Sequence, residues 1–342
     1  MITVKNLCKE YKVLKKEESK KNAIKHIFKR EYEVKQVVNN LSFHISQGEI
    51  VGFIGPNGAG KSTTINMLTG ILLPTRGIVR VNGMDPYKNH IKNVKQIGAV
   101  FGHRTQLWKE MPVIESFQMM KHMYKISDKQ YKENMQLFCD ILDLDNILYK
   151  PVDKLSLGQR MRADFACANL HNPKILYLDE PTIGLDVIAK ESILNFIYEV
   201  NKLRKTTVIL TTHNVTDIEK ICSRVMVIDK GGMVYNGDIK RMKAVFALEH
   251  TMQLEIDNMR FPDLEDLPIK KYKIEKNGIS ITYDNKIINS SIILNHIVKQ
   301  CHIKSIKMYE PNLNDIVRAM YEKIPAQSIQ RGGNNGETIN SS

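Results

Sequence analysis

The chain has 342 residues, of which 42% are apolar and 25% charged, so its composition is that of a folded globular protein rather than a disordered one. No apolar run approaches the roughly 20 residues that cross a bilayer, and the five cysteines form no CxxC pair, which argues against a membrane-spanning protein, a zinc cluster and a disulfide scaffold. The net charge of +13 would suit a nucleic-acid ligand, but nearly half of the excess lies within residues 1–35.

The N-terminal region predicts three strands with an insert between the first two. Residues 1–7 and 34–45 alternate apolar and polar side chains, and Ile50–Ile54 is strongly apolar. The insert, residues 13–33, is rich in lysine. We favour a solvated surface excursion, and the alternative is a short basic amphipathic helix that contacts anionic lipid or a partner.

The middle of the chain predicts an α/β arrangement. Apolar residues within 113–149 recur at spacings of three and four, which predicts two or three packed helices. Beyond them, predicted strands alternate with predicted helices. The strands are at 175–178, 207–211 and 225–228, and the helices at 187–203 and 217–222. Such alternation favours a largely parallel sheet.

The pattern changes after Asp238, where short strands and helices predict a small α+β domain over residues 250–325. Its strands are expected at 252–257, 271–275, 279–283 and 303–309, and its helices at 290–299 and 313–324. An Asn277-Gly278 turn joins the second and third strands. Residues 326–342 are rich in Gly, Asn and Ser, and we expect a disordered tail there.

A glycine-rich loop directly follows the strand at 50–54 and matches the pattern G-x-x-x-x-G-K-[ST]. Backbone amides of such a loop cradle phosphates, together with the positive end of the helix that follows. Lys61 adds a charge, and the Ser62 hydroxyl can ligate Mg²⁺. The predicted nucleotide-binding residues of the loop are Gly55, Pro56, Asn57, Gly58, Ala59, Gly60, Lys61, Ser62 and Thr63.

Two carboxylates end the apolar strand at 175–178. Open α/β sheets bind ligands at the carboxyl ends of their strands, so Asp179 and Glu180 are expected beside the loop. Asp179 is predicted to hold Mg²⁺, directly or through water, because magnesium prefers hard oxygen ligands. Glu180 is predicted to orient or deprotonate the attacking water.

The segment Leu155-Ser156-Leu157-Gly158-Gln159 is similar to the LSGGQ signature of ATP-binding-cassette (ABC) ATPases. The resemblance covers residues 1–240 and implies a P-loop NTPase fold of the α/β class, with a helical subdomain at about 103–170 and ATP and Mg²⁺ as ligands. It also implies that two cassettes dock head to tail, so that Ser156, Gly158 and Gln159 complete the ATP site of the other chain.

The resemblance assigns three further residues. Tyr11 looks like the aromatic that stacks on adenine, although simple packing is the alternative because the insert follows it. Asp186, in Gly184-Leu185-Asp186, resembles the D-loop residue, and His213 resembles the switch histidine that senses the γ-phosphate.

One departure concerns the loop that couples the ATP site to the transporter in this family. His103 stands where a glutamine is expected, and Gln106 is a candidate substitute. This run, the basic insert and the C-terminal domain resemble a bacterial subgroup whose membrane partners are ABC-2 type permeases used in export.

The sequence therefore predicts a cytoplasmic ATPase, held at the inner face of the cell membrane by a separate ABC-2 type permease and paired with a second cassette. The apparent lack of a secretory signal agrees with this location. One alternative is a soluble ABC ATPase acting on ribosomes or nucleic acid, but only one loop and one signature occur, and no aromatic-rich basic stripe. Another is a nucleotide-gated regulator, against which the intact pair of carboxylates argues. No nucleic-acid partner is expected, and the transported substrate is not indicated.

Overall fold

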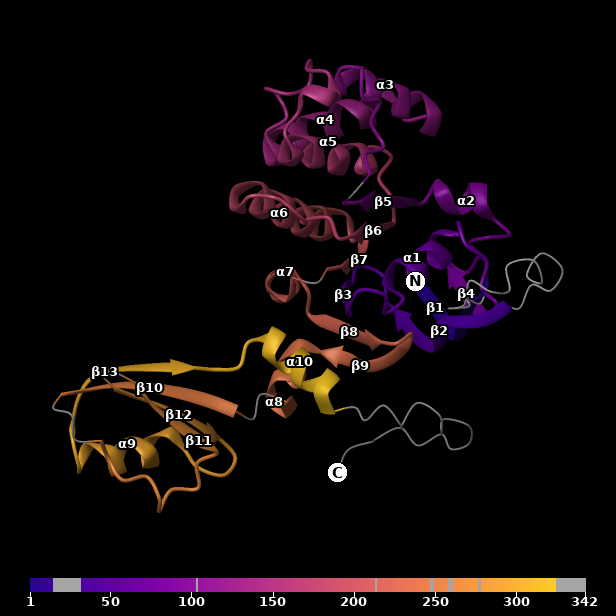
Figure 1. The fold of residues 1–342 in the computed structure, drawn as a ribbon. Coiled ribbons are helices and arrows are strands. Elements are labelled where there is room, and N and C mark those ends of the chain that lie inside the picture. The colour runs from indigo at the N-terminus through magenta and orange to yellow at the C-terminus, as the bar shows by residue number, and fades with distance from the viewer. Residues whose placement is uncertain are drawn as a thin grey trace, which may run out of the picture. The chain divides into compact units, whose positions relative to one another are not determined.

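The structure of the protein is a computed structural model (Figure 1). It describes residues 1–14, 32–102, 104–212, 214–246, 249–257, 261–275 and 278–323. The chain divides into two compact units, Met1–Asp238 and Ile239–Ser342, which are described separately. Within the described ranges, no helix combines the length and apolar character that crossing a membrane requires.

The first unit contains two β-sheets. One is antiparallel, in the order β2-β1-β4, and consists of β1 (Ile2–Leu14), β2 (Tyr32–Ile45) and β4 (Arg76–Val81). The other has the order β5-β6-β7-β3-β8-β9, and its neighbours are parallel except for the antiparallel pair β8-β9. Its strands are β3 (Ile50–Ile54), β5 (Ile97–Phe101), β6 (Ile175–Asp179), β7 (Thr207–Thr211), β8 (Arg224–Asp229) and β9 (Gly232–Asp238).

The main core of this unit joins both sheets to helix α1 (Lys61–Thr69). Leu41 from β2, Phe53 from β3 and Ile65 from α1 belong to one cluster of buried side chains. Each such side chain contributes about 1.5–3 kcal/mol when it is fully removed from water. Because β3 is buried along its whole length, the loop that follows it starts from a fixed point in the fold.

The remaining helices of the first unit are α2 (His90–Val94), α3 (Val113–Tyr124), α4 (Asp128–Leu142), α5 (Leu157–Asn169), α6 (Val187–Arg204) and α7 (Val215–Ile221), with a 3₁₀ turn at Val152–Lys154. Helices α3, α4 and α5 form a group next to strand β5, at the edge of the six-stranded sheet (Figure 1). Phe196 of α6 packs edge-on against Phe138 of α4 and Phe165 of α5, with ring centroids 5.3 and 6.1 Å away. This aromatic cluster fixes the helical group on α6.

The second unit is a four-stranded antiparallel sheet with helices. The sheet order is β11-β12-β10-β13, with β10 (Glu249–Asp257), β11 (Lys271–Glu275), β12 (Gly278–Asp284) and β13 (His302–Tyr309). The helices are α8 (Ile239–Phe246), α9 (Ser290–Val298) and α10 (Leu313–Lys323). Ile293 and Ile297 of α9 pack with Met252 and Ile281 of the sheet in a separate core.

The fold class predicted from the sequence is confirmed: the main sheet is largely parallel and helices follow its strands. The predicted insert, residues 13–33, is too long at both ends. Strand β1 runs to Leu14 and pairs there with Tyr32, so residues 13, 14, 32 and 33 belong to strands. The basic part of the insert, Asn277 and the predicted tail at 326–342 lie outside the described residues.

Candidate functional site

The glycine-rich loop curls back on itself between β3 and α1. Gly60 caps α1 with φ 102°, and a Cβ there would lie 2.7 Å from the Val37 carbonyl oxygen, so only glycine fits. The Ala59 N–H donates to the Pro56 carbonyl at 3.1 Å. The loop therefore presents its backbone, and the N-terminal end of α1, to a common space.

Lys61 opens α1 and is almost buried, with 7% of its surface exposed. Its Nζ donates to the carbonyl oxygens of Gly55, at 2.6 Å, and Pro56, at 3.3 Å. Burial lowers the pKa of Lys61, while the charges of Glu180 and Asp179 act in the opposite direction. An anion bound beside this amine would favour its charged form, so the position suits a phosphate.

A cavity of about 590 Å³ brings the loop and the strand-end carboxylates together. Loop and helix α1 contribute Asn57, Gly58, Gly60, Lys61, Ser62, Thr63 and Asn66. Asp179 and Glu180 lie on its wall. Val37, Ile71, Phe101, Gly102 and Arg104 complete it. An amine, a hydroxyl and two carboxylates around one space are the groups that phosphoryl transfer to water requires.

Thr211, at the end of β7, fixes both carboxylate residues. It pairs with Asp179 in the parallel register of β6 and β7, and its hydroxyl donates to Asp179 Oδ1 at 2.5 Å. The N–H of Glu180 donates to the Thr211 carbonyl at 3.0 Å and lies 3.1 Å from its hydroxyl oxygen. Glu180 itself adopts φ 52°, a left-handed backbone conformation, so the chain turns sharply directly after Asp179.

The donor set on this cavity fits a magnesium ion. The Ser62 hydroxyl and the Asp179 carboxylate are hard oxygen ligands, and both residues line the cavity together with the glycine-rich loop. Mg²⁺ is commonly held by one or two carboxylates together with substrate phosphates, without a dedicated cage of protein ligands. Among the described residues, no group of three or more His, Cys, Asp or Glu side chains could hold a metal ion.

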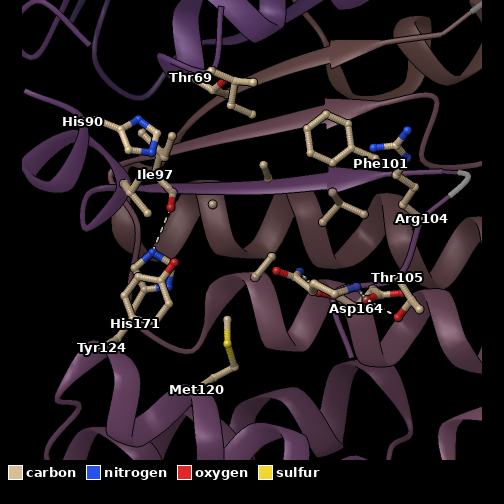
Figure 2. Close-up of a pocket in the computed structure, with 17 residues that line it drawn as sticks. Thr69, His90, Ile97, Phe101, Arg104, Thr105, Met120, Tyr124, Asp164 and His171 are labelled. Carbon is tan, nitrogen blue, oxygen red and sulfur yellow. Dashed lines mark hydrogen bonds between the residues drawn. The ribbon is translucent and has the colours of Figure 1, made fainter. Parts of the chain in front are cut away.

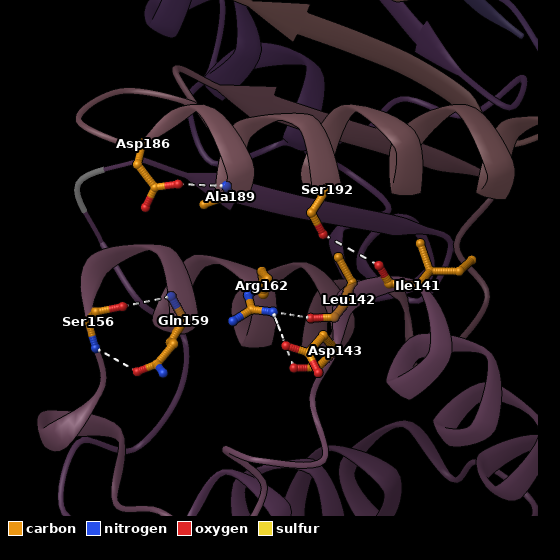
Figure 3. Close-up of polar contacts among 9 residues, drawn as sticks. All are labelled: Ile141, Leu142, Asp143, Ser156, Gln159, Arg162, Asp186, Ala189 and Ser192. Atoms are coloured by element: carbon orange, nitrogen blue, oxygen red, sulfur yellow. Dashed lines mark hydrogen bonds and ion pairs between the residues drawn. The ribbon is translucent and has the colours of Figure 1, made fainter.

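The signature segment lies elsewhere, at the start of α5 (Figure 3). Ser156 Oγ accepts from the Gln159 N–H at 3.2 Å, and Gln159 Oε1 accepts from the Ser156 N–H at 3.0 Å. A Cβ on Gly158 would lie 2.9 Å from the Cβ of Ala189, so glycine allows α5 to approach α6 closely. None of the three predicted signature residues lines the cavity.

Asp186 is also outside the cavity and caps α6, accepting from the Ala189 N–H at 2.8 Å (Figure 3). The signature segment and the predicted D-loop residue thus lie next to each other at the starts of two adjacent helices. This places the two motifs together, away from the cavity that joins the glycine-rich loop to the carboxylates.

Gln106 lines a second cavity, of about 290 Å³, between β5 and the helices α2, α3 and α5. Its side-chain amide donates to the Asp164 carbonyl at 3.1 Å, and its backbone N–H donates to Asp164 Oδ1 at 3.0 Å. It is not among the residues that line the first cavity. Arg104 lines both cavities, and Figure 2 shows it among the residues of the second one.

Tyr11 is predicted to stack on adenine, but the structure places it outside the cavity. Tyr11 is 38% exposed on β1, where Lys9 Nζ lies 5.1 Å from its ring centroid, and it does not line the cavity. His103 and His213 lie outside the described residues.

The sequence did not single out Thr211, Arg104 or Asp164. Thr211 ends a predicted strand, as Asp179 does, so a predicted pairing of these two strands would have flagged it. Arg104 and Asp164 gave no comparable signal, because their importance depends on contacts between distant segments.

Comparison with known proteins agrees with this geometry. The family model described as ABC transporter matches residues 38–183. YhcH of Bacillus subtilis (strain 168), described as an uncharacterized ABC transporter ATP-binding protein, is 30% identical over 282 residues, which cover 82% of this chain and 89% of that protein. The linearmycin resistance ATP-binding protein LnrL of the same organism is 26% identical over 294 residues, which cover 83% of this chain and 93% of that protein.

A solved structure is also similar. It is a dimeric ATP-binding cassette in a post-hydrolysis state, bound to ADP and Pi, with a TM-score of 0.58 and 24% identity. The match covers 70% of this chain and 99% of that one, and it supports the fold.

Proposed function

The chain belongs to the family of ABC transporter ATP-binding proteins and is an ATPase of that family, and on this premise we propose that it powers export through a separate ABC-2 type permease. The similarity to a resistance ATP-binding protein supports the direction of transport. The chain would then lie at the inner face of the cell membrane, attached through the permease.

The observation that carries the proposal is the cavity that joins the glycine-rich loop to Asp179 and Glu180. In it, the loop amides and Lys61 hold the β- and γ-phosphates, and Glu180 acts as general base toward the attacking water. Thr211 holds the Asp179 carboxylate in place. Ser62 and Asp179 would hold Mg²⁺, which neutralises phosphate charge during the reaction. His213 is proposed to sense the γ-phosphate and His103 to serve in the coupling loop.

A second cassette is part of the proposal. The signature residues Ser156, Gly158 and Gln159 do not line the cavity of their own chain, which supports a role in completing the cavity of another chain. Size-exclusion chromatography of the Glu180→Gln variant, with and without ATP and Mg²⁺, tests this arrangement. ATP should shift the protein from monomer to dimer. A monomer under saturating ATP, with the permease present as well, would contradict the shared site.

The proposed function is tested by ATP hydrolysis with and without the permease in proteoliposomes. We expect the permease to stimulate the wild type, and Lys61→Ala to lower kcat/KM by at least about 100-fold because the buried amine is lost. Lys132→Ala, which removes an exposed lysine of α4, is the matched control and should behave as wild type. Equal rates for wild type and Lys61→Ala would refute the proposed site. ATP-driven uptake of a compound from a test panel into inside-out vesicles tests the export direction, and ATP-driven uptake into right-side-out vesicles instead would refute it.

A further inference from the structure

A short loop after β5 connects the two cavities described above. At its start, the Gly102 N–H donates to the Asp179 carbonyl at 2.9 Å, which ties the loop to the strand of the predicted magnesium ligand. Arg104 lies on the walls of both cavities. Within the described ranges, its guanidinium forms no ion pair. The loop therefore carries a positive charge to the wall of the cavity that also holds Asp179 and Glu180.

The far end of the loop is held by Asp164 of α5, which is 3% exposed (Figure 2). Asp164 Oδ1 accepts from the Thr105 hydroxyl at 2.9 Å and from the Gln106 N–H at 3.0 Å. Its carbonyl accepts from the Gln106 side chain at 3.1 Å. Three hydrogen bonds thus join the loop to a single residue of the helix.

These contacts resist displacement of the loop for a physical reason. A buried carboxylate is costly unless its oxygens are hydrogen-bonded, and both donors to Oδ1 come from the loop. A shift of the loop relative to α5 would leave this acceptor unsatisfied. Since α5 begins directly after Ser156, the helix that carries the signature segment also fixes the loop beside its own ATP cavity.

We propose that Asp164 is a positioning residue: by holding Thr105 and Gln106, it places Arg104 on the wall of the ATP cavity, where the guanidinium meets the phosphates of bound ATP. Movement of the signature helix then changes the position of Arg104. The inference rests on the proposed ATPase function. It gives Asp164 and Arg104 roles at the site in addition to those of the glycine-rich loop.

Thr105 provides a mild way to test the contact. Thr105→Val keeps the shape of the side chain but removes the donor to Asp164, whereas Thr105→Ser keeps the hydroxyl. We expect Thr105→Val to lower kcat by about 10-fold with the ATP Kd within about twofold of wild type. The substitution removes the hydrogen bond to the buried Asp164 carboxylate and also the one that the Thr105 hydroxyl accepts from the Leu107 N–H at 3.1 Å. Thr105→Ser should retain most of the wild-type kcat.

A double-mutant cycle separates positioning from plain stability. If the contact acts through Arg104, adding Thr105→Val to Arg104→Gln should cause less than about a twofold further loss of kcat. Wild-type kcat in Thr105→Val, an equal loss in Thr105→Ser, or losses that multiply in the double variant would overturn the inference. Melting temperatures confirm that the variants are folded. Hydrolysis by the wild type and its loss in Lys61→Ala test the proposed function separately. The ATPase function and the positioning role of Asp164 can therefore be refuted independently of each other.

Discussion

At the scale of single residues, the site depends on buried polar groups whose partners come from distant segments. Thr211 contacts Asp179 across two parallel strands, and Asp164 contacts Thr105 across the boundary of a helix and a loop. The loop motif and the strand-end carboxylates could be predicted from the sequence because their chemistry lies in consecutive residues. The roles of Thr211, Arg104 and Asp164 could not be predicted in this way, because each depends on a contact with a residue from a distant segment of the chain.

Gln106 illustrates the same limit. Its position in the chain made it a candidate for the coupling role, but its side chain is held by the Asp164 carbonyl and lines the second cavity. The sequence gives the order of residues in a loop, whereas the direction of each side chain depends on the helix that packs against it.

The raised pKa of Asp164 predicts how the folding stability of the protein depends on pH. Burial raises its pKa to about 6, although the Gln106 N–H, the Thr105 hydroxyl and the charge of Arg160 act in the opposite direction. Between the ordinary value near 4 and pH 6, the folded protein retains a proton that the unfolded chain has released. Ionisation of Asp164 therefore costs folding free energy, and this cost is fully present above pH 6.

The stability of the wild type should thus rise relative to Asp164→Asn as the pH falls from 7 to 5, by at most about 1.4 kcal/mol per pH unit. Urea unfolding of both proteins over one pH series measures the difference, and other titrating groups cancel in the comparison. A difference that stays constant over this range would show that Asp164 ionises normally.

At the scale of elements, apolar runs and alternation predicted most strands and helices of the main sheet. They did not predict how far β1 and β2 extend, since the pairing of Leu14 with Tyr32 continues the sheet into a segment whose composition reads as an insert. Nor did they predict the strand order. The edge position of β5, whose following loop contributes to both cavities, is set by the strand order of the sheet and cannot be read from the residues of β5.

The aromatic cluster that joins α6 to α4 and α5 predicts a large stability effect. Phe196→Ala removes a fully buried ring that packs edge-on against two others, so unfolding should become easier by about 3–5 kcal/mol. Tyr198→Ala on the same helix removes a ring that is 48% exposed, and a change within about 1 kcal/mol is expected. Denaturant unfolding measures both. Similar losses for the two variants would mean that the cluster does not hold the helical group.

At the scale of the whole molecule, a cassette of 238 residues is followed by a second unit with its own antiparallel sheet and core. We propose that this second unit is an accessory domain, as the change of pattern after Asp238 predicted. The cassette places an ATP cavity and a signature surface at separate places on one chain. We propose that this separation is why one chain supplies half of each of two ATP sites and needs a second cassette for turnover.

The central claim is that the cavity between the glycine-rich loop and the end of β6 hydrolyses ATP with Glu180 as its base. ATP turnover by Glu180→Gln, measured beside its equilibrium ATP binding, tests this claim most directly. We expect binding within about threefold of wild type and kcat reduced by at least about 100-fold, because the amide cannot accept the proton of the attacking water. Glu133→Gln, at an exposed position of α4, should leave both quantities unchanged. Hydrolysis by Glu180→Gln at the wild-type rate would contradict the account.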